Sequence, residues 1–359
     1  MSKVIENTIT KRQYIFILIS AVVGIGILSA PNSICQKAEQ SGWISMFIGC
    51  IYPLTITYCA YLSYKNLGFI DFYTLNERIY GKFFTKIIFI FFMLTLTIYA
   101  SSVLSGFFNV LSKEISFFLP PSMIVTVVSL TIVFTASFGL QSLGRLSEIV
   151  FYFSSILFLF PLFTIKKGDI TNILPLISSF EKILSSIPAS FYSYAGIEIS
   201  FFILPYVVSK KTIKNAGFIS SIIIALIYTS LTFLTIYYLG FELTTKIYYP
   251  VLFIMETIEI SIISDFKIVF IFLWSGIILK ILACDYFVIA HTFSRLTHIP
   301  YKKSCLITWP FVMMFTVFMI PEHGRNVFLE NTIPYIVYTM LLYSIITAIL
   351  SKLKVMKGV

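Results

Sequence analysis

The stretch Ala21-Val22-Val23-Gly24-Ile25-Gly26-Ile27-Leu28-Ser29-Ala30-Pro31 lies in the middle of the first long apolar segment of the chain. It places two glycines and a proline where a membrane-spanning helix should be most regular, and both residue types weaken helical geometry. Inside a bilayer, a helix can break only where protein or a water-filled cavity satisfies the freed backbone groups. The stretch therefore predicts a binding site within the membrane and not only an anchor.

The composition indicates a helical membrane protein. Of the 359 residues, 58% are hydrophobic and 12% are charged, with a mean hydropathy of +0.93, whereas soluble proteins carry about 25% charged residues. Apolar segments of spanning length recur and do not alternate with polar residues, which favours helices over a barrel. We expect a single permease-like transmembrane domain over residues 1–359. The net charge of +10 is explained by basic residues that orient the chain in the bilayer, and we expect no nucleic-acid partner.

Ten segments are predicted to span the membrane. They are residues 13–34, 42–64, 87–108, 119–140, 146–165, 184–208, 216–240, 266–290, 304–320 and 329–350, with polar connections at 65–86 and 241–265. With both termini placed in the cytoplasm, most Lys and Arg residues fall on the cytoplasmic side of the membrane, as is usual for membrane proteins. A split into five and five gives repeats at about 13–165 and about 184–350. An odd number of spans per half makes the two halves enter from opposite sides, as in an inverted repeat.

A second interruption is predicted in the sixth span, at Ser193-Tyr194-Ala195-Gly196-Ile197-Glu198. It occupies the same place in the second repeat as Gly24 does in the first, and matched interruptions indicate a substrate site at the bilayer midplane. Glu198 is an acid at bilayer depth, which costs on the order of 3 kcal/mol. Such an acid indicates either a functional site or a structural hydrogen bond to a neighbouring helix.

The two breaks predict where a small zwitterion would bind. Amides at the start of the half-helix after Gly26 would attract a carboxylate, and carbonyls near Ala195 and Gly196 would suit an ammonium group. The alternative is that the glycines only allow another helix to approach closely, and that Tyr99 is a packing residue. The predicted ligand-binding residues are Gly24, Ile25, Gly26, Ile27, Tyr99, Tyr194, Ala195, Gly196 and Glu198.

Lys280 is the second predicted charge inside the membrane. Its expected partners are Asp285 or the carbonyls freed at the first break, and its ammonium could take the place of a coupling cation. The three histidines and five cysteines have no metal-ligand spacing, and no nucleophile–base pair or phosphate-binding loop is present. We therefore expect no metal, no cofactor and no enzymatic activity.

Several motifs in order resemble the spore germination permease family of the amino acid–polyamine–organocation superfamily. They are the stretch from Gly24 to Pro31 followed by Gly42-Trp43-Ile44, then Gly81-Lys82, the segment from Gly139 to Glu148, Ala195 to Glu198 with Pro205, and Trp274 with Lys280. The resemblance implies a leucine-transporter-like fold of ten helices, with helices 1 and 6 interrupted. Gln141 departs from the family's Gly-x-Glu pattern, which puts a subunit or gating contact in doubt.

The resemblance also implies a function. It indicates the ligand-sensing B-type subunit of an endospore germinant receptor, in the spore inner membrane or cell membrane. Its expected partners are an A-type membrane subunit, a C-type lipoprotein, and a small nutrient such as an amino acid. The alternative is a proton- or cation-coupled amino-acid transporter of the same superfamily, because both functions need the same site.

Overall fold

The computed structural model describes residues 8–116, 118–158, 165–210, 213–258 and 266–356. These residues are mostly helical and contain no β-strand, only an isolated bridge between Ile9 and Val207. The first half comprises α1 (Lys11–Val22), α2 (Gly26–Ala38), η1 (Glu39–Ser41), α3 (Gly42–Gly49), α4 (Ile51–Leu67), α5 (Phe72–Glu114), α6 (Pro121–Ser137), α7 (Leu140–Ser154) and η2 (Ser155–Phe158). Each of the first five predicted spans coincides with helix, although residues 159–164 of the fifth lie outside the described part.

The second half follows the predicted spans in the same way. It comprises η4 (Ile170–Ile173), α8 (Phe180–Ser186), η5 (Ile187–Ser190), α9 (Phe191–Tyr194), η6 (Ile197–Ile199), α10 (Ser200–Ile203), η7 (Leu204–Tyr206), α11 (Ile213–Leu239), α12 (Phe241–Lys246), α13 (Pro250–Glu256), α14 (Phe266–Thr297), α15 (Tyr301–Phe318) and α16 (Glu322–Met356). The polar connection predicted at 241–265 holds α12 and α13, and its last residues, 259–265, are outside the described part.

By length and composition alone, five helices of the described residues could cross a membrane, or up to seven if each of two bent pairs is one span. The first pair, residues 122–137 and 140–158, turns by 119° and covers the fourth and fifth predicted spans. The second pair, residues 180–194 and 197–206, bends by 57° within the sixth predicted span. The remaining helices are too short or not apolar enough to pass that test alone.

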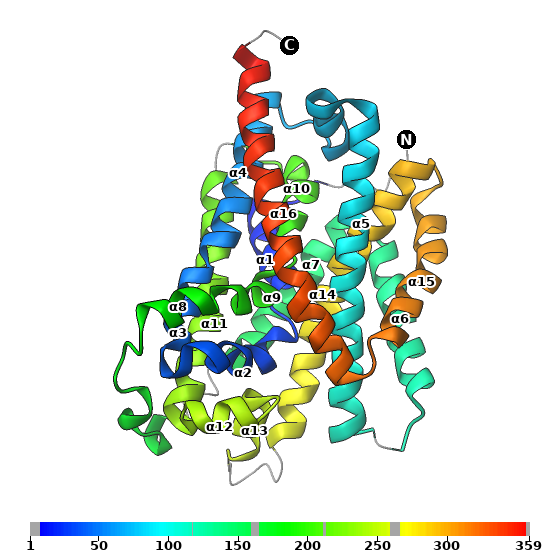
Figure 1. The fold of residues 1–359 in the computed structure, drawn as a ribbon. Coiled ribbons are helices and arrows are strands. Elements are labelled where there is room, and N and C mark those ends of the chain that lie inside the picture. The colour runs from blue at the N-terminus through cyan, green and yellow to red at the C-terminus, as the bar shows by residue number, and fades with distance from the viewer. Residues whose placement is uncertain (1–7, 117, 159–164, 211–212, 259–265, 357–359) are drawn as a thin grey trace.

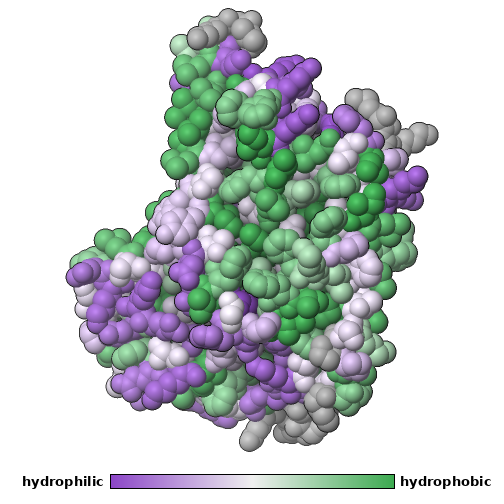
Figure 2. All heavy atoms as spheres, turned by 45° about the vertical axis from the view of Figure 1, so that its right-hand side comes forward, coloured by the Kyte–Doolittle hydropathy of each residue, from purple (hydrophilic) through white to green (hydrophobic). Residues whose placement is uncertain are grey.

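The helices pack into a bundle with two polar ends. Helix α1 begins and α16 ends at one end, which we name the terminal end, while α2, α12 and α13 lie towards the other, the vestibule end (Figure 1). Hydrophobic residues cover much of the middle of the face seen in Figure 2, and hydrophilic residues gather at its two ends. This distribution is typical of a protein whose middle contacts lipid.

The helix boundaries follow from local chemistry. Thr10 and Gln13 form a capping box at the start of α1, and Asp71 caps α5 by accepting from the amides of Tyr73 and Thr74. The connection predicted at 65–86 proves largely helical, because α5 begins at Phe72. Gly81, with φ of +80°, kinks α5 and separates this first piece from the spanning part.

Candidate ligand-binding site

The first predicted interruption is confirmed. Helix α1 ends at Val22, three residues are non-helical, and α2 begins at Gly26. The amides of Ile27 and Leu28 donate to the carbonyls of Gly24 and Ile25 at 3.3 and 3.0 Å, so part of the predicted anion-binding amide set is used within this turn. Of the amides at this break, those of Ile25 and Gly26 have no main-chain partner among the described residues and therefore remain for a bound anion.

Helix α14 covers the first break. A Cβ atom on Gly24 would lie 2.7 Å from Cδ1 of Ile281, and the indole Nε1 of Trp274 donates to the Gly24 carbonyl at 3.5 Å. A side chain at position 24 would therefore displace the terminal methyl group of Ile281. The eighth predicted span, which forms α14, therefore packs against the first.

The second predicted interruption is also confirmed, and it touches the first. Helix α9 ends at Tyr194, Ala195 is extended, and Gly196 has φ of +99°. A Cβ atom on Gly196 would lie only 2.1 Å from the carbonyl oxygen of Ala21. Only glycine combines this left-handed backbone with so close an approach. The two breaks, distant in sequence, are therefore in direct backbone contact.

Glu198 stabilises the second break from inside. Its side chain is 1% exposed, and its carboxylate accepts a hydrogen bond from the Gly196 amide at 2.8 Å. It also accepts from the hydroxyl of Tyr99 at 3.4 Å and from the hydroxyl of Tyr52 on α4. These contacts agree with the structural alternative for Glu198. Tyr52 was not foreseen, because nothing in the sequence distinguishes it among 22 tyrosines.

A small cavity lies between the two breaks, and we name it the central cavity. Its volume is about 20 Å³, which is room for about one water molecule. Four predicted site residues line it, together with six that were not predicted. The predicted residues are Ile25, Gly26, Tyr99 and Ala195, and the others are Ala21, Val22, Val103, Tyr192, Ile281 and Asp285.

The other predicted site residues lie around this cavity without lining it. Gly24, Gly196 and Glu198 build the two breaks, as described above. Ile27 lines a separate apolar cavity beside Trp274. Tyr194 points towards α3, where its hydroxyl donates to the Met46 carbonyl at 2.7 Å.

Lys280 and Asp285 do not pair. Five residues on an α-helix correspond to a rotation of about 140°, so the two side chains leave α14 on different sides. Asp285 lines the central cavity, whereas Nζ of Lys280 lies 5.9 Å from the ring centroid of Phe151 on α7. Nζ has no hydrogen-bond partner among the described residues. The expectation that Lys280 contacts Asp285 or the first break is therefore wrong.

Tyr192 separates the central cavity from a larger opening. A vestibule of about 330 Å³ is lined by polar residues of α2, α12 and α16, among them Asn32, Gln36 and Asn326. Tyr192 lines this vestibule, the central cavity and a small cavity of about 20 Å³ between them. Its hydroxyl lies 3.0 Å from Oγ of Ser102 on α5. Tyr192 is therefore the side chain that all three cavities share.

The terminal end is closed by main-chain and ionic contacts. The Ile9 amide donates to the Tyr206 carbonyl and the Val208 amide donates to the Ile9 carbonyl, both at 3.0 Å. The guanidinium of Arg295 lies 2.6 Å from the carboxylate of Asp71. The central cavity is thus reached more readily from the vestibule end than from the terminal end.

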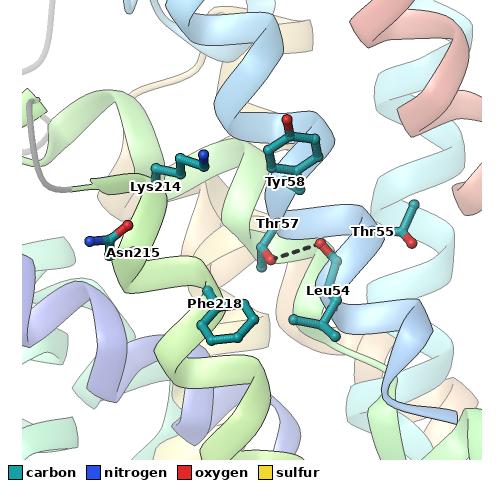
Figure 3. A pocket seen from close by; sticks show the side chains of 7 residues that line it. All are labelled: Leu54, Thr55, Thr57, Tyr58, Lys214, Asn215 and Phe218. Atoms are coloured by element: carbon teal, nitrogen blue, oxygen red, sulfur yellow. Dashed lines mark hydrogen bonds between the residues drawn. The ribbon is translucent and has the colours of Figure 1, made fainter. Parts of the chain in front are cut away.

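Another pocket lies away from the two breaks. It measures about 460 Å³ and is formed by α4 and α11, with Lys214 and Tyr58 beside each other and Leu54 and Phe218 facing the same hollow (Figure 3). None of its lining residues borders the central cavity. It is therefore separate from the site between the breaks.

A family model for spore germination proteins matches residues 8–327. The chain belongs to the spore germination protein family. Two relatives of this family member come from Bacillus subtilis (strain 168). Spore germination protein B2 is 21% identical over 341 residues, which cover 91% of this chain and 90% of the relative. Spore germination protein YndE is 23% identical over 280 residues, 75% of each chain.

A solved structure shares the fold of this spore germination protein. The crystal structure of MhsT in complex with L-phenylalanine has a TM-score of 0.67, with 96% of this chain and 88% of that chain covered. The sequence identity of 12% makes this a likeness of fold alone. The expected leucine-transporter-like, all-α membrane fold is confirmed. The chain is of the permease or receptor type and is not an enzyme.

Proposed function

We propose that this protein is the ligand-sensing B-type subunit of a nutrient germinant receptor. It would lie in the spore inner membrane with both termini in the cytoplasm, and it would signal to an A-type membrane subunit and a C-type lipoprotein. Membership of the spore germination family supports this proposal, and so does a fold shared with a protein solved in complex with an amino acid. The ligand is a small nutrient, most simply an amino acid.

The observation that carries the proposal is the backbone contact between the two breaks, with the central cavity beside it. The carboxylate of an amino acid would meet the amides of Ile25 and Gly26 at the start of α2, and its ammonium would lie on the side of Ala195. The cavity of about 20 Å³ is far smaller than any amino acid. Binding must therefore favour an arrangement in which the surrounding helices stand further apart, and this difference in affinity is what can be signalled.

Lys280 has a separate role in the proposal. Its ammonium is 1% exposed and faces the ring of Phe151, an arrangement that stabilises a cation without a counter-ion. A permanent ammonium at this depth would replace a coupling cation between α14 and α7. Sensing by this subunit would then need no sodium gradient.

A pair of glycine substitutions tests the binding site. A Cβ atom on Gly26 would lie 3.0 Å from Oη of Tyr228 and 3.4 Å from Cα of Ser193, so Gly26→Leu should push α2 away from these residues and distort the site beside it. Gly324 on α16 has no atom within 4 Å of such a Cβ, so Gly324→Leu is the matched control. Spores carrying Gly26→Leu should not germinate in a mixture of amino acids, although immunoblots show the protein in the spore membrane. Normal germination of these spores would overturn the proposal.

The second candidate is an amino-acid transporter. The vestibule of about 330 Å³ beside Tyr192 favours a transporter, because alternating access needs a path from one side of the membrane to a central site. The purified protein in liposomes would then accumulate labelled amino acid. Binding without accumulation favours the receptor.

A further inference from the structure

Asp285 is a buried acid that none of the contacts described above employs. Its side chain is 1% exposed, and its Oδ1 atom has no hydrogen-bond partner among the described residues. It borders the central cavity, as do Ile25 and Gly26 at the first break. An ionised carboxylate removed from water and left without a partner is strongly disfavoured. The environment of Asp285 is therefore incomplete without a donor or a cation in the cavity.

The protein's own cations do not serve Asp285. Lys280 leaves α14 on another side and faces Phe151. Arg325, near the next cavity towards the vestibule, lies 3.6 Å from Glu322 and donates to Tyr249 at 3.4 Å and to Ser105 at 3.5 Å. The nearby acid Glu198 has its own donors, including the Gly196 amide. The positive group that matches Asp285 must therefore enter the cavity from outside.

Two aromatic rings complete a cation site. Tyr99 and Tyr192 line the same cavity as Asp285, and tyrosine rings attract an ammonium group within about 6 Å. The remaining walls, such as Val22 and Val103, are apolar and admit only a small aliphatic body. The arrangement of one carboxylate, two rings and apolar walls matches an organic ammonium group.

We propose that Asp285 binds the ammonium group of the ligand and so restricts this protein to small primary amines, including amino acids. Carboxylates without an amine, and uncharged sugars, would leave the carboxylate unpaired and would not bind. The proposal rests on the ligand site proposed above. It adds the chemical class of the ligand and the residue that selects it.

Three probes of similar size and different charge test the proposal: propylamine, L-alanine and propionate. Each is titrated against the full-length protein in detergent, with thermal unfolding as the readout. Asp285→Asn keeps the shape of the side chain and removes its charge. Asp169→Asn, at an exposed loop position, is the matched control. A charge-assisted hydrogen bond is lost only in the first variant, which should weaken the binding of amine probes by about 30-fold.

The expected result is that propylamine or L-alanine stabilises the wild type and Asp169→Asn, that Asp285→Asn loses this effect, and that propionate has none. Equal responses of wild type and Asp285→Asn to the amines would overturn the proposal. Stabilisation by propionate, or by sodium or potassium chloride in place of the amines, would overturn it as well.

Germination assays on spores of two variants distinguish a failure of this inference from a failure of the proposed function. If Asp285→Asn spores germinate normally in amino acids while Gly26→Leu spores do not, the site is right and the role of Asp285 is wrong. If both variants germinate normally, the ligand site itself is wrong. Loss of germination in both variants, with normal germination of Asp169→Asn spores, supports both proposals.

Discussion

Replacing Gly196 by alanine should separate the two breaks. The added Cβ atom would stand 2.1 Å from the carbonyl oxygen of Ala21 and 3.1 Å from its carbonyl carbon. An ordinary contact requires the two backbones to part by roughly 1 Å. Because both partners are backbone, no side chain can turn aside to accept the methyl group. The strain must move α1 away from the second break.

The expected loss of folding stability in Gly196→Ala has two parts, and a control variant can separate them. Placing alanine at a φ of +99° costs about 1–2 kcal/mol by itself, and the overpacking adds about 1–3 kcal/mol. Gly68 has a similar φ of +90° and no atom within 4 Å of its Cβ position. Gly68→Ala should therefore show the backbone term alone. The sum for Gly196→Ala stays below a typical folding stability of roughly 5–15 kcal/mol, so the protein should still fold.

The assay compares the two variants in spores and in detergent. Gly196→Ala spores should lose germination in amino acids, and the purified protein should unfold at a lower temperature than Gly68→Ala. Gly68→Ala spores should germinate at the wild-type rate. If Gly196→Ala behaves like Gly68→Ala in both measurements, the contact between the breaks is not needed for sensing, and the reasoning from this contact fails.

Two further predictions concern Lys280 and Tyr192. Lys280→Met should raise the unfolding temperature, because an ammonium without a hydrogen-bond partner is removed from the interior. The same variant should abolish germination. A normal germination rate would exclude a role for the ammonium in sensing. Tyr192→Ala should open the path from the vestibule, which can be measured as faster reaction of a maleimide with an Ala21→Cys variant. The five native cysteines are buried and should contribute little labelling. An unchanged labelling rate would mean that Tyr192 does not close the path.

The breaks and the spans could be predicted because their signals are local. Gly24, Gly26 and Gly196 weaken helical geometry wherever they stand in a helix, and apolar runs report membrane depth without reference to any partner. The contact of Gly196 with Ala21 could not be predicted, since it depends on how two helices 175 positions apart approach each other. The sequence thus contains the positions of the breaks but not the distance between them.

The residues that line the central cavity could not be predicted from the sequence for a related reason. Helix α14 is apolar around most of its surface, so no hydrophobic stripe indicates which side faces the protein interior. The rotation of α14 decides that Asp285 borders the cavity and that Lys280 faces Phe151. Both charges were visible in the sequence. Their separate environments are set by packing against α5, α7 and α1, which periodicity does not encode.

The contacts also indicate which helices must move when a ligand enters. The first and sixth spans are joined twice, by the approach of Gly196 to Ala21 and by the main-chain bonds of Ile9 with Tyr206 and Val208. Two backbone contacts this far apart hold the pair as one body. The other wall of the cavity, on α5 and α14, meets this pair through side chains, among them Tyr99, which contacts Glu198, and Trp274, which contacts Gly24. Side-chain contacts separate more easily than joined backbones, so a cavity of about 20 Å³ should expand between these two walls.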